Sequence, residues 1–470
     1  MDSEPMGETF GSAAAGGARQ LWLFTARDSL FFGAGLPFFA GETGRQKSRF
    51  PPSPLTMQGA VRAILLQAHH ADVREFVRGW CTTCRRPAAE CPVMQMVGEE
   101  NDAETSAISL RGPLVATDDG ELFYPAPLDL AWGRRRPSGV QAQADKPTKE
   151  LVRLVPSEDA TWTDMGLRRL PAAPEGYEDL SGVEGRYLAA HDFSQYLLGT
   201  VPKPGQLIDL WEVPEEAQTE GGAEQKHRVP PVADELHVGI GLNPKTRTAQ
   251  EHMLYITHHV RLAKGYSLAE QVEPAFAGAN GRQNGDGAGS HGQADVAQAL
   301  PDVAGILADL VRHAPDVVRL GGESRLSFLQ VRKCAGPTTD EKRQIANTLD
   351  SQNSRQGPLR FRLVLLQPAR FRQGWLPDGL NPESLSGALR GVPVKLVSAC
   401  LGKPVRQGGW DLANRRPKPT AAFVPAGSVY FFETTDPHCS GREIVEALHD
   451  EKLGLQTKAG FGHVMVGCGW

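Results

Sequence analysis

The stretch "SRFPPSPLTMQGAVRAILLQAHH" (residues 48–70) places three prolines and two serines directly before an apolar helix. Ser53 is a suitable N-cap, and Pro54 suits the first helical position, where its missing N–H costs no hydrogen bond. The preceding stretch "QLWLFTA" (residues 20–26) alternates as a strand does. These two stretches predict a strand followed by a helix near the start of the chain.

Four further segments extend this pattern. We predict a strand, a strand, a helix and a strand at "LHVGIGL" (236–242), "HMLYITHHVRL" (252–262), "PDVAGILADLVRH" (301–313) and "SRLSFLQV" (324–331). Together with the first pair they make a β-α-β-β-α-β order, which is the split ferredoxin-like unit. It carries an insertion at about 80–235, which is long enough to have structure of its own.

The last part of the chain repeats the same order. We predict strands at "PLRFRLVLLQP" (358–368), "VPVKLVSAC" (392–400), "AGSVYFFET" (426–434) and "GFGHVMVG" (460–467), and helices at "NPESLSGALRG" (381–391) and "SGREIVEALHD" (440–450). The prediction is therefore an α+β protein with two tandem ferredoxin-like, RRM-like units, residues 19–345 and 346–470. We expect a disordered tail at residues 1–18 and a mobile, glycine-rich loop at residues 276–298.

Composition and charge exclude some classes of protein. The 470 residues contain no apolar run long enough to span a membrane, and the first residues lack the basic and apolar regions of a signal peptide. We therefore expect a cytoplasmic protein with no membrane partner. The formal charge of −5 excludes a uniformly basic surface, but residues 360–418 hold eleven Lys or Arg against three acidic residues, a local net charge of +8. Such a segment is a candidate surface for a polyanion.

A series of short motifs spans most of the chain. In order they are "RDSLFF", "FPPSPLTMQGAVR", "GPLV", "FYPAPLDL", "HVGIGLNPKTRTAQEHMLY", "LGGESRLSF", "GGWDL" with "PKP", "VPAGSVYFFE" and "KAGFGHVMVG". Their order and spread resemble the third-subunit family of the type III-B CRISPR Cmr effector complex, a branch of the RAMP superfamily. The resemblance implies a non-catalytic subunit that grips the repeat-derived 5′ tag of the CRISPR guide RNA (crRNA). It also implies two protein partners, the large polymerase-like subunit and the backbone RAMP subunit.

The stiff entrance to the first helix is one predicted RNA contact. Free N–H groups and the positive end of the helix dipole make a helix N-terminus a suitable phosphate site, and prolines reduce the entropy lost on binding. The predicted contacts are the cations Lys47, Arg49 and Arg62 for phosphates, and the polar Ser53, Thr56 and Gln58 for sugars or base edges. The alternative for this motif is an ordinary capped helix start.

The stretch "KAGFGHVMVG" (458–467) is the second predicted RNA contact. Its glycines would let an RNA backbone approach closely, and an exposed Phe461 would stack on a base. The alternative is a tight turn with Phe461 in the core. The glycine-rich loop of the RAMP superfamily falls at the same place, so the resemblance favours RNA. The predicted contacts are Lys458, Gly460, Phe461, Gly462 and His463.

Seven cysteines are too few for a disulfide framework in a chain of this length. Three of them lie in "WCTTCRRPAAECPV" (residues 80–93), where Cys81, Cys84 and Cys91 have a spacing that suits tetrahedral Zn²⁺. Candidates for a fourth ligand are His69, His70 and the remote Cys334, Cys400, Cys439 and Cys468. A structural zinc ion is the only cofactor that this sequence suggests, and free buried thiols are the alternative.

Two other functions fit the same sequence. The first is a metal-independent RNA-processing endonuclease of the same superfamily, in which a histidine and a lysine or tyrosine activate a 2′-hydroxyl. Its candidate histidines are His69, His258 and His463. The second is a protein-binding scaffold, which would have no RNA affinity that falls with salt.

We assign no catalytic residue. Three aspartates lie in the family-like motifs, namely Asp28, Asp129 and Asp411. Asp28 of "RDSLFF" and Asp411 of "GGWDL" are expected to cap turns rather than bind metal. His258 and His259 are neighbours on a predicted strand, so they should point to opposite faces and cannot form an acid and base pair.

Overall fold

The computed structural model describes most of the chain. The described residues are 19–33, 45–71, 73–99, 102–136, 149–163, 166–211, 231–275, 302–352, 357–411, 414 and 416–470. The predicted tail at 1–18 and the predicted loop at 276–298 lie outside them. None of the described helices is long and apolar enough to cross a membrane.

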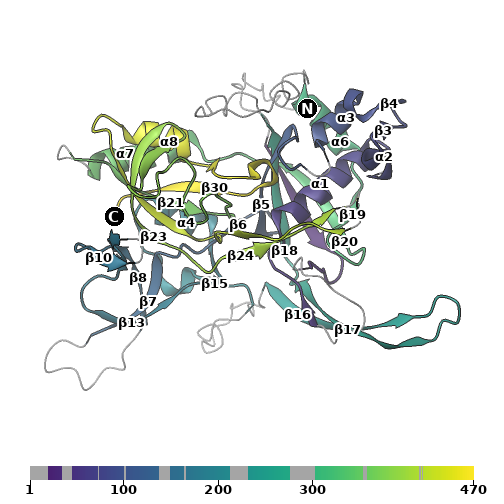
Figure 1. Cartoon of the computed structure of the whole chain (residues 1–470), viewed down its shortest axis with the longest axis horizontal. Helices are drawn as coiled ribbons and strands as arrows, with labels where there is room; N and C mark the ends of the chain where they lie inside the picture. Colours follow the sequence, from purple (N-terminus) through teal and green to yellow (C-terminus); the bar gives the residue numbers. More distant parts are fainter. Residues whose placement is uncertain are drawn as a thin grey trace, which may run out of the picture.

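The fold is α+β and is built around two large antiparallel sheets (Figure 1). The larger sheet has eight strands in the order β15-β14-β6-β5-β18-β1-β20-β19. Its central strands are β5 (Ile108–Thr117), β18 (Tyr266–Pro274), β1 (Gln20–Ala26) and β20 (Leu326–Lys333). The outer strands are β15 (Ile208–Asp209), β14 (Arg186–Ala189), β6 (Leu122–Pro125) and β19 (Val317–Arg319).

Two helices pack on this sheet, α1 (Pro54–Ala68) and α6 (Val303–Arg312). Ser53 caps α1 as predicted, because its side chain accepts a hydrogen bond from the Leu55 N–H at 3.3 Å. Met57 and Leu65 of α1 and Leu307 of α6 are buried in one cluster with Trp22 of β1. In chain order, the central strands and these helices run β1, α1, β5, β18, α6, β20.

The strands predicted at 236–242 and 252–262 form, but they are not in this sheet. They are β16 (Val232–Leu242) and β17 (Ala249–Leu262), which pair with each other, while β2 (Arg45–Lys47) runs parallel to β17. The resulting hairpin projects from the body (Figure 1). Our placement of these strands in the central sheet was wrong, because alternation predicts a strand and not its partner.

The true central strand β5 lies inside the predicted insertion. Nine of its ten residues are buried, so the strand shows no alternation. It also contains Gly112 and Pro113, which argue against a strand in sequence analysis. Arg111 and Ser109 add polar side chains to the same buried segment. These features explain why the sequence did not predict β5.

The second sheet has six strands in the order β22-β23-β28-β21-β30-β29. They are β22 (Ser386–Leu389), β23 (Val392–Cys400), β28 (Val429–Thr434), β21 (Arg360–Leu365), β30 (His463–Cys468) and β29 (Glu451–Lys452). Helices α7 (Thr339–Gln352) and α8 (Gly441–Leu448) lie side by side against it (Figure 1). Ile345 of α7 and Ile444 of α8 join Phe361 of β21 in one core.

The helix predicted at 381–391 is wrong. This segment forms turns and β22, which pairs with β23 across a tight connection. Asn381 turns the chain by accepting hydrogen bonds from the Glu383 and Ser384 N–H groups, and Arg390 and Gly391 both have positive φ. A left-handed pair is typical of a two-residue hairpin, which therefore overrides the weak helical pattern.

A buried ion pair joins the segment between β5 and β18 to the second sheet. Arg362 donates to Asp129 at 2.8 Å, and the Tyr196 hydroxyl, on α4 (Ala190–Leu197), donates to the same carboxylate at 2.6 Å. All three side chains are fully buried. The Asp129 carboxylate therefore neutralises a buried guanidinium.

A second network joins the two sheets directly. Arg19 donates to Asp450 at 2.7 Å and to Glu273 at 2.9 Å, while Arg111 donates to the Asp450 carbonyl oxygen at 2.9 Å. His463 contacts the Asp450 carboxylate at 2.8 Å. The start of β30, and with it the glycine-rich loop, is therefore held within the junction of the two sheets.

Candidate nucleic-acid interface

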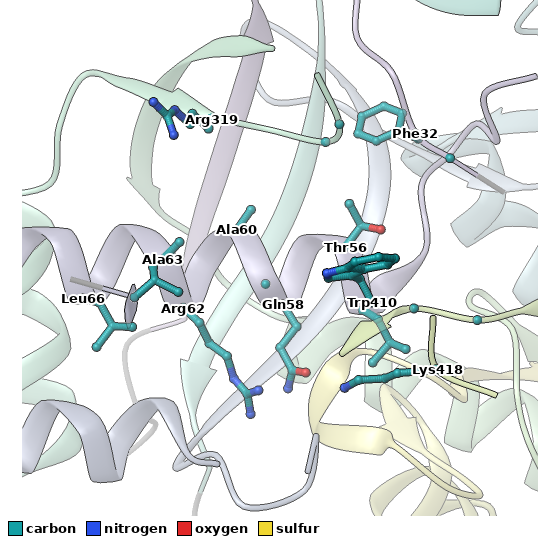
Figure 2. Close-up of a pocket in the computed structure, with 18 of the residues that line it drawn as sticks. Phe32, Thr56, Gln58, Ala60, Arg62, Ala63, Leu66, Arg319, Trp410 and Lys418 are labelled. Atoms are coloured by element: carbon teal, nitrogen blue, oxygen red, sulfur yellow. The ribbon is translucent and has the colours of Figure 1, made fainter. Parts of the chain in front are cut away.

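A groove of about 520 Å³ runs along one side of α1 (Figure 2). We call it the α1 groove. The helix contributes small residues to it, among them Gly59, Ala60 and Ala63. The other walls come from Phe32 and Gly33, from Arg319 with Gly321 and Gly322, from residues 408–410 with Lys418, and from Val73 and Phe76. Four separate parts of the chain thus meet at one helix face.

The sequence of α1 leaves this face open. Met57 and Leu65 point to the core and are fully buried, whereas Gly59 is exposed. A Cβ added at Gly59 would meet no atom within 4 Å. Glycine within a helix costs about 0.5–1 kcal/mol relative to alanine, so Gly59 weakens the helix while leaving its backbone accessible.

Trp410 is the most prominent side chain of the groove. It is 57% exposed and lies beside Thr56 and Lys418 (Figure 2). It sits on β25 (Trp410–Asp411), which pairs with β26 (Arg416–Pro417) within the segment of net charge +8. Asp411 shapes this ribbon, because it accepts hydrogen bonds from the N–H and Nδ2 of Asn414 at 2.9 Å. This contact confirms that Asp411 caps a turn.

The groove is positively charged. Arg319 reaches it from β19, and Lys418 from the ribbon that carries Trp410. Within the described part of the chain, neither side chain forms an ion pair. An exposed indole in a groove with two such cations suits a single-stranded polyanion with flat bases, because cations attract the backbone and the ring stacks on a base.

The predicted contacts Gln58 and Arg62 line this groove together with Thr56. Both long side chains also tie α1 to the chain before β5. The Gln58 side chain donates to the Ala103 carbonyl oxygen at 3.1 Å, and Arg62 donates to that of Asp102 at 3.0 Å. Both residues are buried, so Thr56 is the more accessible of the three.

The predicted phosphate seat at the start of α1 lacks the free N–H groups that we expected. The N–H groups of Thr56 and Met57 donate to the Ser53 carbonyl oxygen at 2.8 and 3.3 Å, and that of Leu55 donates to the Ser53 hydroxyl. Pro54 has no N–H to offer. The first-turn donors are therefore used within the turn itself.

The entrance residues instead support the neighbouring ribbon of β24 (Val405–Gln407) and β27 (Ala421–Phe423). The Ser53 hydroxyl donates to the Gln407 side chain at 2.6 Å, and Arg49 donates to the Arg406 carbonyl oxygen at 2.7 Å. Burial lowers the pKa of Arg49. Lys47 is exposed on β2 and does not line the groove.

The glycine-rich loop is closed. Phe461 is fully buried and stacks on Phe423, with 4.7 Å between ring centroids. Gly460 has φ +109°, and a Cβ there would lie 2.9 Å from the Gly112 carbonyl oxygen of β5. Gly462 has φ +71°, and a Cβ there would collide with the backbone of Leu453. The prediction of an exposed Phe461 is wrong, because the glycines admit another part of the same chain.

The charged members of this loop are also covered. His463 is buried against Asp450, and burial lowers its pKa to about 4. Lys458 is half-buried near Glu104, and burial lowers its pKa as well. Of the five predicted contacts in this loop, Gly460, Phe461, Gly462 and His463 are buried, and Lys458 is half-buried.

The three candidate histidines lie in separate parts of the molecule. His463 is in the junction of the sheets, His258 contacts Asp234 at 2.8 Å on the hairpin, and His69 lies among cysteines. His259 is buried on the other face of β17, where it stacks on His237, which confirms the predicted opposite directions.

Asp28, the remaining motif aspartate, forms ion pairs with Arg261 at 2.7 Å and Arg325 at 3.8 Å. The carboxylate therefore links the start of the first unit to the projecting hairpin.

The predicted metal ligands Cys81, Cys84 and Cys91 come together, and His69 joins them as the fourth donor. His70 does not, and neither do the remote cysteines.

Comparison with known proteins gives three results. A family model described as CRISPR-associated protein (Cas_Cmr3) matches residues 22–468. No curated protein matches the chain. Several solved structures match at low identity, and three of them are type III-B Cmr-beta complexes.

The three complexes were determined by cryo-EM. The one bound to cognate target RNA and AMPPnP, state 1, shares 14% identity over 88% of this chain and 86% of that chain, with a TM-score of 0.37. The one bound to cognate target RNA has the same identity and coverage and a TM-score of 0.38. The apo state shares 12% identity over 67% of this chain and 97% of that chain, with a TM-score of 0.23. Because the family model covers nearly the whole sequence, the chain belongs to the CRISPR-associated Cas_Cmr3 family.

Proposed function

We propose that this chain is a non-catalytic, RNA-binding subunit of a type III-B Cmr effector complex and that it grips the 5′ tag of the crRNA. Membership of the Cas_Cmr3 family supports a place in such a complex. The observation that carries the RNA assignment is the α1 groove, which a helix face of small residues, an exposed Trp410 beside Lys418, and Arg319 line together.

The groove suits an unpaired RNA segment better than a duplex. Its exposed indole can stack on one splayed base, and the cations that line the groove can hold phosphates of the same strand. The bare backbone at Gly59 allows a ribose or phosphate to approach the helix closely. These features favour a short single strand such as the crRNA tag.

We propose further that the two sheets are tandem ferredoxin-like RAMP units. The strand order β5-β18-β1-β20 and the order β23-β28-β21-β30 support this assignment. Among the described residues of the second unit, one α-helix, α8, lies between the strands, and α7, which precedes β21, packs beside α8. The predicted unit boundary at residue 345 falls within α7, so we assign the whole of α7 to the second unit.

The projecting hairpin supports contact with other subunits. Leu236, Val238, Ile240 and Leu242 alternate along β16 and are 47–62% exposed. Leu254 of β17 pairs with Ile240 and is also exposed. A contiguous apolar stripe on an exposed element is typical of an interaction surface. We propose the large polymerase-like subunit and the backbone RAMP subunit as the partners.

The separation of the three candidate histidines favours binding over RNA processing. His463 is buried, His258 is paired with Asp234, and His69 lies in the cysteine cluster. Incubation of the purified chain with repeat RNA in the absence of metal should leave the RNA intact. Cleavage that is lost in a His258→Ala variant would instead identify an endonuclease.

Gly59 offers a direct test of the groove. Gly59→Leu fills open space and should not disturb the core, so it should weaken binding of tagged crRNA by about tenfold or more, as measured by fluorescence anisotropy. Gly59→Ala adds only a methyl group and favours the helix, so it is the matched control. An untagged RNA of equal length reports whether the tag is the ligand. Wild-type affinity of Gly59→Leu for tagged crRNA would place the RNA elsewhere.

A further inference from the structure

Three thiols and one imidazole converge at the end of α1. His69 is the residue at the C-cap of this helix, and Cys81 lies on β3 (Trp80–Cys81). Cys84 lies in the turn before β4 (Arg86–Pro87), and Cys91 directly precedes α3 (Pro92–Val97). The four donor atoms all lie within 4.8 Å of one another. Four separate chain segments are thus brought to one point.

The distances match a tetrahedral metal centre. His69 Nε2 is 3.2 Å from Cys84 Sγ and 3.7 Å from the sulfurs of Cys81 and Cys91, and the sulfurs of Cys84 and Cys91 are 3.6 Å apart. Zinc–ligand bonds of about 2.0–2.3 Å with tetrahedral angles place donor atoms about 3.5–3.8 Å apart. A disulfide would need sulfurs about 2 Å apart. We propose that Cys81, Cys84, Cys91 and His69 bind one structural Zn²⁺ ion.

The turn between the first two cysteines is shaped for this purpose. The Cys84 N–H donates to Cys81 Sγ at 3.4 Å, and Arg85 has φ +53°, which closes the turn. An amide donor stabilises a thiolate, the form of cysteine that binds metal. Cys81 and Cys91 are fully buried and His69 and Cys84 are half-buried, and four protein donors leave no open position for substrate. A closed set of three thiolates and one imidazole is typical of structural zinc.

The stretch from α2 to β4, residues 73–87, precedes the well-buried α3 and has only one buried residue, Cys81. Helix α2 (Val73–Arg78) has no buried residue, and β3 and β4 have two residues each. Small segments without a core of their own are commonly held by a metal or a disulfide. The ion would tie this segment to α1 and so position Val73 and Phe76 at the edge of the α1 groove.

The test is metal analysis of the full-length chain, purified without a histidine tag in reducing, chelator-free buffer. We expect about one zinc ion per chain. Co²⁺ in place of zinc should give the visible absorption of a tetrahedral thiolate site. Cys84→Ser and His69→Ala should lose the metal, whereas His69→Cys should keep it, because a thiolate is an equally good ligand.

His70→Asn is the matched control, since His70 is exposed, adjacent to His69 and has φ +58°, which asparagine tolerates. It should retain the full zinc content. Zinc content below about a tenth of an equivalent together with no visible Co²⁺ spectrum would overturn the proposal, since a built site binds metal tightly. So would iron in place of zinc, or retention of zinc by both Cys84→Ser and His69→Ala. None of these measurements depends on RNA binding.

Discussion

The α1 groove and the glycine-rich loop carry the same sequence signals, and they have opposite environments. Each contains glycine, an aromatic residue and a cation. In the groove, Gly59 faces open space and Trp410 is 57% exposed. In the loop, Gly460 faces the backbone of Gly112, and Phe461 is fully buried. A glycine allows a close approach in both places, but only the rest of the chain decides whether that approach is made by a ligand or by another strand.

Truncation of the buried aromatic ring should have the largest effect. We expect Phe461→Ala to reduce the free energy of unfolding by about 3–5 kcal/mol, because it leaves a cavity against Phe423. Urea denaturation followed by circular dichroism measures this change. Unchanged stability combined with weaker RNA binding would show that the loop is open, and would remove the contrast with the groove.

Truncation of the exposed ring should affect RNA and leave the fold intact. We expect Trp410→Ala to weaken binding of tagged crRNA by about 1–3 kcal/mol, because a stacked base is lost. The matched control is Trp162→Ala, which removes an indole that is 80% exposed on β10 (Thr161–Thr163), outside the groove. Equal affinities for these two variants would contradict a stacking role of Trp410.

Acid should destabilise the fold through the buried histidines His449 and His463, which lie at and near the glycine-rich loop. Burial lowers the pKa of His449 and of His463 to about 4. The unfolded chain, with ordinary histidines near 6.5, binds more protons between pH 6.5 and 4, so stability should fall as the pH drops through this window. We expect a loss of about 1–2 kcal/mol per histidine between pH 7 and pH 5. His449→Gln should reduce the pH dependence of the urea midpoint, and an unaltered dependence would show that His449 is accessible.

The smallest effect concerns the cations. Lys418→Ala should lower the slope of the logarithm of RNA affinity against the logarithm of salt concentration by about one unit. The reason is that binding with one phosphate contact fewer releases fewer counterions. Lys47→Ala, an exposed lysine outside the groove, should leave the slope unchanged. Salt titrations of both variants with tagged crRNA separate the groove from the helix entrance. A slope that falls in Lys47→Ala and stays unchanged in Lys418→Ala would instead place the phosphate site at the entrance to α1.

Features that depend on local sequence were predicted better than features that depend on distant contacts. Strands with a clear pattern of apolar residues, such as β21, β23, β28 and β30, form where they were predicted. The partners of strands were harder to predict. The hairpin of β16 and β17 has stronger alternation than the buried β5, so we assigned the hairpin to the sheet position that β5 occupies. The groove was predicted only in part, through Thr56, Gln58 and Arg62. A signal for the rest was present in the glycines of "LGGES" and "GGWDL", which line its other walls.

The sequence by itself determined those features that depend only on residues close together in the chain. Apolar periodicity identified α1, α6 and α8 and the long strands β1, β20, β21, β23, β28 and β30, the spacing of three cysteines predicted a metal site, and the dispersed motifs identified the family. Only the tertiary structure selected His69 rather than His70 as the fourth donor, buried Phe461 and left Trp410 exposed. These outcomes depend on contacts between segments that are far apart in the chain. Local sequence encodes the conformation of a segment, whereas exposure depends on which distant segment packs against it.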